Sequence, residues 1–179
     1  YHAVTFGVLL GEAWTRTTGT PLADLVDGVT ASVGADVRLA PDDAQVEATL
    51  PMTFTPWAAI TGSALRPAAP DGGLAPFGGN ATRYNTPAFV RAGLGSLGMT
   101  GTADGLARLL SAVLDGRIGG SQALARLTAD ASRGRDRVLG VTTAFGEGSQ
   151  RPFPRLAGLG PRSFGHEGAN GTLAYADPD

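Results

Sequence analysis

Apolar positions recur at helical spacing along two stretches at the start of the chain. Residues 3–18 predict one helix, and Gly19 follows where a left-handed C-cap commonly lies. Thr20 and Pro21 then predict the N-cap and first residue of a second helix, which runs to Gly34. We therefore expect two helices that follow each other directly.

The middle of the chain has no sustained period. Residues 36–40 alternate as in a short strand, but residues 41–101 are rich in Pro, Gly and Thr. A structureless loop of that length is rare inside a compact domain. We therefore expect residues 41–101 to be a folded, loop-rich segment that packs over the rest and shapes a substrate pocket.

Two more helices are predicted after this segment. Thr102 caps the clearest one, whose apolar stripe of leucine and valine stops at Gly116. A shorter helix follows from Ser121 to about Ala131. The second half of the chain therefore opens as an α-helical region.

The period then changes to that of strands. Residues 138–145 predict one strand, and residues 163–166 and 172–176 predict a hairpin with Asn170-Gly171 in its turn. Helices first and consecutive strands last favour an α+β fold with helices packed on an antiparallel sheet. We expect residues 1–179 to form part of one such domain.

Composition narrows the possible functions. The net charge of −2 and the pI near 5.6 give no reason to expect binding to nucleic acid or to anionic lipid. No apolar run is long enough to span a membrane. All 14 basic residues are arginine. The absence of cysteine leaves the compartment open, and the oligomeric state is open as well.

Two familiar patterns are better explained as decoys. Residues 93–98 match the dinucleotide fingerprint Gly-x-Gly-x-x-Gly, but no predicted strand precedes them and no helix opens at Gly98. The two histidines, His2 and His166, have no metal-ligand spacing. We expect neither a cofactor nor a metal.

Three segments, in order, carry a specific resemblance. They are Tyr1-His2-Ala3 entering the first helix, the run 101–108, and Phe164-Gly165-His166-Glu167-Gly168 in the hairpin. They resemble the second motif, the helix after the substrate loop and the third motif of the serine β-lactamase-related family. This family includes class C β-lactamase-like esterases and penicillin-binding-protein-like serine hydrolases. The resemblance implies a partial β-lactamase/transpeptidase-like fold, truncated at both ends.

The resemblance also implies roles for four residues. Tyr1 takes the place of the catalytic tyrosine, and His166 stands where penicillin-recognising enzymes have the lysine of Lys-Thr-Gly. Gly168 permits close approach of the backbone, and the Ala169 N–H is one oxyanion-hole donor. A phenol with a pKa of about 10 needs nearby positive charge to act as a base. The serine and lysine of the family's Ser-x-x-Lys segment lie outside this chain.

The expected activity is hydrolysis of a small ester or lactam-like substrate through an acyl-serine intermediate. Ala3 replaces an amide or hydroxyl side chain of many relatives, which favours an esterase over a β-lactamase. The segment from Ala92 to Met99 departs from the family's usual small polar run, which leaves the shape of the pocket open. One alternative is a non-catalytic penicillin-binding-like module that binds a peptide or lactone. Another is a truncated product without activity, and we expect the fragment alone to be inactive.

Overall fold

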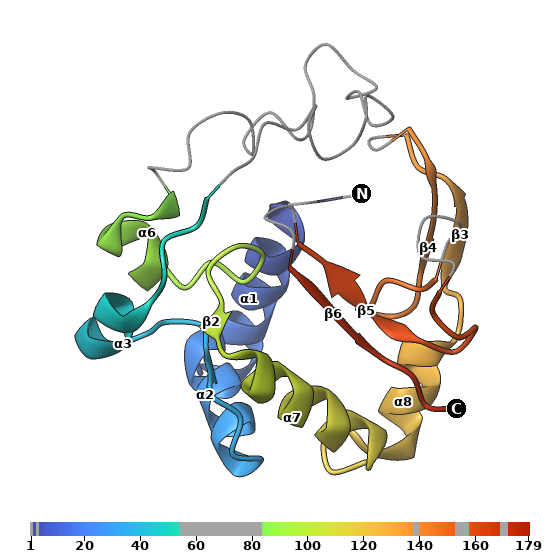
Figure 1. Ribbon diagram of the computed structural model, residues 1–179, viewed down its shortest axis with the longest axis horizontal. Helices are drawn as coiled ribbons and strands as arrows, with labels where there is room; N and C mark the ends of the chain where they lie inside the picture. Colours follow the sequence, from blue (N-terminus) through green and yellow to red (C-terminus); the bar gives the residue numbers. More distant parts are fainter. Residues whose placement is uncertain (1, 3, 54–83, 138–139, 153–157, 169–171) are drawn as a thin grey trace. The chain divides into compact units, whose positions relative to one another are not determined.

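The computed structural model describes residues 2, 4–53, 84–137, 140–152, 158–168 and 172–179. These residues divide into two compact units, an N-terminal unit up to Leu106 and a C-terminal unit from Ala107 onward. Figure 1 shows the elements of each unit in chain order. The predicted α+β class is confirmed, and every strand pairing among the described residues is antiparallel.

The N-terminal unit opens with the two predicted helices. Helix α1 (Thr5–Thr18) ends at Gly19, whose φ of 72° is the left-handed conformation expected of a C-cap. Helix α2 (Leu22–Ser32) begins one residue later than predicted, because Pro21 is its extended N-cap. The prediction that Thr20 caps this helix is wrong: no N-cap side chain binds its first turn, and the Thr20 N–H itself donates to Thr18.

Helix α1 buries its glycines rather than its apolar stripe. Gly7 and Gly11 are its buried residues. A β-carbon on Gly11 would lie 3.0 Å from the side chain of Leu22, so this glycine lets α2 approach closely. Trp14 is half-buried, and four other large apolar side chains of α1 are exposed: Phe6, Val8, Leu9 and Leu10.

A short two-stranded sheet completes the core of this unit. Strand β1 (Val37–Arg38), predicted from its alternation, pairs with β2 (Thr100–Gly101). Val37 and Leu39 are almost fully buried. The Asp36 carbonyl accepts the Thr102 N–H, which joins the start of β1 to the residue that precedes α7.

The loop-rich segment contains helices that its composition concealed. Helix α3 (Asp43–Ala48) begins with a capping box, in which Asp42 and Gln45 each bind the other's main chain. Helix α6 (Pro87–Arg91) is capped by the Thr86 side chain. Residues 54–83 lie outside the described residues. Residues 43–48 and 87–91 of this segment are therefore helical, whereas the sequence predicted no periodic elements there.

The two predicted helices of the second half are present. Helix α7 (Ala103–Leu114) is capped by Thr102, whose hydroxyl accepts the Gly105 N–H at 2.9 Å. Helix α8 (Gly120–Thr128) ends about three residues earlier than expected. None of the helices in the described ranges is long and apolar enough to cross a membrane.

Four strands of the C-terminal unit follow one another in an antiparallel arrangement. Strand β3 (Ser132–Arg135) pairs with β4 (Thr142–Phe145), and β5 (Phe164–Glu167) pairs with β6 (Leu173–Ala176). Gln150 bridges Phe145 on one side and Gly165 on the other, so it links the two hairpins. In Figure 1 the hairpins appear in orange and red. The fully exposed strand β3 was not predicted, because its polar sequence has no strand-like alternation.

Candidate functional site

The structure describes two of the four predicted site residues. His166 and Gly168 lie on the β5–β6 hairpin. Tyr1 and Ala169 lie outside the described residues, as does the Asn170-Gly171 turn. The site is therefore built here from the hairpin and from the residues that hold it.

The register of the hairpin fixes the place of the predicted third motif. His166 faces Ala174 across the ladder, and the Gly168 N–H donates to the Thr172 carbonyl at 2.7 Å just beyond the strands. The predicted hairpin is confirmed by this pairing. His166 therefore lies near the end of a paired strand, and Gly168 lies just beyond that end and is hydrogen-bonded to Thr172.

The imidazole of His166 is oriented by its own strand. Its Nδ1 lies 2.6 Å from the Glu167 carbonyl oxygen. A carbonyl only accepts, so Nδ1 carries the proton and Nε2 carries the lone pair of the neutral ring. The residue is exposed by its accessible surface, yet the protein atoms around the ring, among them Phe145 at 6.4 Å between ring centroids, partly desolvate it. Desolvation lowers the pKa of His166 below its ordinary value.

A row of contacts crosses the hairpin beside His166. Gln150 pairs with Gly165, which pairs in turn with Tyr175 on β6. The Tyr175 hydroxyl donates to Gln150 Oε1 at 2.5 Å, and the Glu167 N–H donates to the same oxygen at 3.2 Å. A β-carbon on Gly165 would lie 2.8 Å from the Tyr175 ring, so this row requires a glycine between its partners.

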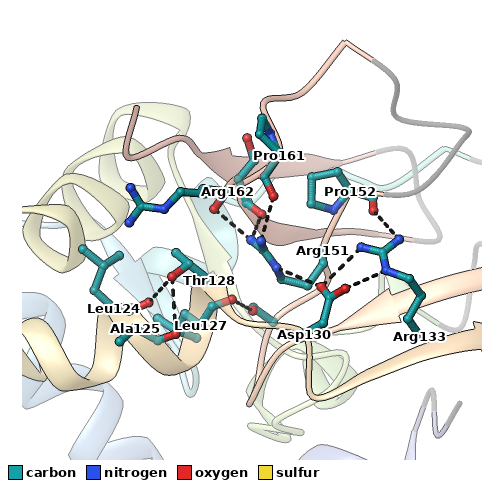
Figure 2. Close-up of polar contacts among 12 residues, drawn as sticks. Leu124, Ala125, Leu127, Thr128, Asp130, Arg133, Arg151, Pro152, Pro161 and Arg162 are labelled. Atoms are coloured by element: carbon teal, nitrogen blue, oxygen red, sulfur yellow. Dashed lines mark hydrogen bonds and ion pairs between the residues drawn. The ribbon is translucent and has the colours of Figure 1, made fainter.

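A buried arginine holds the chain just before β5. Arg151 has only 4% of its side chain exposed. Its guanidinium donates to the carbonyls of Pro161 and Arg162, at 2.8 Å each, and to that of Ser163 (Figure 2). Because the three carbonyls are consecutive, one side chain fixes the path by which the chain enters β5. Hydrogen bonds to a charged donor are among the stronger ones in proteins.

Asp130 balances the charge of this arginine. Its carboxylate lies 3.5 Å from Arg151 Nε and 2.6 Å from Arg133 Nε (Figure 2). The hydrogen bond from Arg133, together with the positive charges of Arg133 and Arg151, lowers the pKa of Asp130. The cluster has a structural explanation and presents no group with a chemical role of its own.

The entry to α1, where the predicted second motif lies, is held by a distant loop. Ser96 Oγ accepts the Gly7 N–H at 2.7 Å, which satisfies a donor in the first turn of the helix. A β-carbon on Gly7 would lie 2.4 Å from the backbone of Gly95. The Gly-x-Gly-x-x-Gly run at 93–98 is thus a turn packed on α1, as the Leu94 carbonyl accepting the Gly98 N–H also indicates.

The described residues contain no group of three or more His, Asp or Glu side chains placed to bind a metal ion. Sequence reasoning missed Gln150, Arg151 and Tyr175 as residues that hold the site. Gln150 and Arg151 lie in a short connection with no period, and nothing in the sequence distinguishes them from surface residues. Only the fold shows that they lie between two strands.

The whole chain is similar to a known protein family. A model of the β-lactamase family matches residues 1–179. No curated protein matches at a significant level.

Three solved structures resemble the chain over 99% of its length. EstA from Arthrobacter nitroguajacolicus Rue61a has a TM-score of 0.81 at 26% identity, and a family VIII carboxylesterase has 0.81 at 25%. A penicillin-binding protein homologue from Caulobacter crescentus has 0.75 at 27%. The chain spans only about half the length of each, between 49% and 50%.

Proposed function

Because this chain belongs to the β-lactamase family, we propose that it is the C-terminal part of a serine hydrolase that cleaves small esters through an acyl-serine intermediate. The chain has no lysine, so the Ser-x-x-Lys segment with the nucleophile lies elsewhere in the protein. The likeness to a family VIII carboxylesterase supports an ester as substrate. Ala3 supports the same choice, since it removes a polar side chain available to a lactam.

In this proposal Tyr1 moves the proton. It accepts the proton of the serine hydroxyl as the serine oxygen attacks the ester carbonyl carbon, and it returns the proton to the departing alcohol oxygen. The Ala169 N–H donates to the carbonyl oxygen as negative charge develops there, and Gly168 allows the substrate to approach the backbone. Water then attacks the carbonyl carbon of the acyl-serine while Tyr1 accepts a proton from the water. Tyr1 returns this proton to the serine oxygen as the bond between the acyl carbon and that oxygen breaks and the acid leaves.

The observation that carries the proposal is the state of His166. Its Nδ1 is bound to the Glu167 carbonyl, and desolvation lowers its pKa, so the neutral ring presents Nε2 as an acceptor. Such an acceptor at the third motif either takes a hydrogen bond from the Tyr1 hydroxyl while Tyr1 carries the proton between the two transfers, or binds a polar donor of the substrate. The two roles differ kinetically, because the first acts on kcat and the second on KM.

A second candidate function is a non-catalytic module that binds a peptide or lactone. The likeness to the penicillin-binding protein homologue favours it. It differs from the first in forming no acyl-enzyme that turns over.

The proposal is tested in the protein that carries this chain together with its Ser-x-x-Lys segment. Tyr1→Phe and His166→Gln should each lower kcat/KM for a short-chain nitrophenyl ester by roughly 100-fold or more, the usual contribution of an acid–base group. Mass spectrometry should detect an acyl adduct on the serine of that segment.

The chain offers a matched control for each variant. Tyr84→Phe alters a tyrosine packed edge-on against Phe89, and His2→Gln alters a histidine bound to Thr5. Neither should change kcat/KM more than about twofold. Ester turnover that survives Tyr1→Phe unchanged contradicts the proposed role of Tyr1, and ligand binding without any adduct supports the second candidate.

A further inference from the structure

We infer that Gln150 is the positioning residue of the site, because it holds both strands of the hairpin that carries His166 and Gly168. Its main chain joins β5 to the rest of the sheet, and its side chain reaches past β5 to β6. The inference rests on the proposed function only for the role of His166. The contacts that support it are independent of any reaction.

The main chain of Gln150 pairs on both sides. Its N–H donates to the Gly165 carbonyl at 2.7 Å, and its carbonyl accepts the Gly165 N–H at 3.1 Å. It also lies opposite Phe145 at the end of β4, where the hydrogen bonds of the bridge come from its two neighbours: the Arg151 N–H donates to the Ala144 carbonyl at 2.8 Å, and the Ser149 carbonyl accepts the Gly146 N–H at 2.9 Å. Single bridges at Gln150 are the only ladder connections between β4 and β5 within the described ranges. The segment 149–151, with Gln150 at its centre, therefore sets the register between the two hairpins.

The side chain of Gln150 adds two further contacts. It is 2% exposed and is among the largest fully buried side chains of the described residues. Its Oε1 accepts from Tyr175 on β6 and from the Glu167 N–H on β5. One neutral acceptor thus binds both strands of the hairpin, and the Glu167 N–H lies in the peptide that directly follows His166.

These contacts bear directly on the His166 ring. The Glu167 carbonyl holds Nδ1 of His166, while the Glu167 N–H is held by Gln150. Loss of the Gln150 acceptor removes the hydrogen bond of the Glu167 N–H, which belongs to the residue whose carbonyl orients the imidazole. Arg151, the next residue, holds the three carbonyls before β5, so the pair fixes both the entry of β5 and its far end.

Gln150→Met tests the inference, because methionine keeps the length of the side chain and removes the acceptor. In the purified protein, amide hydrogen exchange at Glu167 should become about tenfold faster, as expected for the loss of one buried hydrogen bond. The ring nitrogen resonances of His166 should move or broaden in NMR spectra. The chain has only two histidines, so His2 is an internal reference and should not move.

Ser149→Ala is the matched control. Ser149 is the preceding residue, is 6% exposed, and donates to the Leu127 carbonyl at 2.8 Å rather than to the hairpin. It should lower stability by a similar amount and leave the His166 resonances in place. Unchanged His166 and Glu167 signals in Gln150→Met, or equal changes in Ser149→Ala, overturn the inference.

Tyr175→Phe is the second variant, in case Gln150→Met does not fold. It keeps the ring beside Gly165 and removes only one donor to Gln150. A smaller displacement of the His166 resonances supports the inference, and none in a folded protein overturns it. The NMR result does not depend on turnover. If Gln150→Met displaces the His166 resonances while His166→Gln remains fully active, the positioning role of Gln150 is upheld and only the proposed function is refuted.

Discussion

The side chain of His166 combines exposure with a desolvated ring. The residue presents surface to solvent, yet surrounding protein atoms lower the pKa of its imidazole. The Glu167 carbonyl requires a proton on Nδ1. Both effects favour one neutral tautomer, in which the second nitrogen can accept a hydrogen bond. A single residue thus acquires a defined chemical state from its immediate surroundings.

This state predicts a dependence of stability on pH. The pKa of His166 is lower in the folded protein than in the unfolded chain, where it is about 6.5. The contribution of His166 to stability is therefore present above that pH and is lost as the pH falls through the lowered folded value. Denaturant midpoints at pH 7.5 and pH 5.5 should differ less in His166→Gln than in the wild type.

An equal dependence on pH in His166→Gln and in the wild type contradicts the prediction.

At the scale of elements, Arg151 predicts how firmly β5 is tied to the sheet. Arg151→Met removes the donor of three consecutive carbonyls, of which the Ser163 carbonyl makes a buried contact and the other two make part-buried contacts. We expect a loss of about 3 kcal/mol in the free energy of unfolding, measured by urea denaturation.

Arg162→Met is the comparison for this variant, because the Arg162 side chain is 53% exposed and forms an ion pair with Asp179 at 2.7 Å. It should change stability by no more than about 0.5 kcal/mol. Similar losses in the two variants would contradict the role of Arg151 as an anchor.

Elements with strong local signals were predictable from the sequence. Thr102 before an apolar stripe identified α7, and Gly19 identified the end of α1. A helix cap depends on residues that are close in the sequence, so it can be recognised there. The Asp42–Gln45 capping box was present in the sequence as well, but it lay in a segment whose composition indicated loops. Strand β3 has no such signal, since its side chains are all exposed and only its pairing with β4 defines it.

The site was predictable only where motifs are contiguous. His166 and Gly168 were found because they lie in one short run of the β5 hairpin. Gln150 was not, because its role comes from pairing with Gly165, fifteen positions away, and from a hydrogen bond to Tyr175. No periodic pattern records a contact of that kind. The roles of Tyr1 and Ala169, which lie outside the described residues, stay predictions.

At the scale of the whole molecule, the chain spans about half the length of the structures it matches. In the proposed mechanism, this half of the protein supplies the base and one oxyanion donor, and the nucleophile belongs to the Ser-x-x-Lys segment outside the chain. We therefore expect the 179 residues alone to show no turnover of a nitrophenyl ester and no burst of product. Addition of the Ser-x-x-Lys segment should restore both. Burst kinetics from the chain alone would reveal a nucleophile among its own serines.

The contact between Gly7 and Ser96 has a consequence for synthesis on the ribosome. The helix that begins at Thr5 leaves the ribosome before the serine that satisfies its first turn, and 89 positions separate the two bonded residues. At a rate of about 5–20 residues per second, that interval lasts roughly 4 to 18 seconds. During this time the first turn lacks its distant acceptor. The start of this helix is therefore completed only after most of the N-terminal unit has been made.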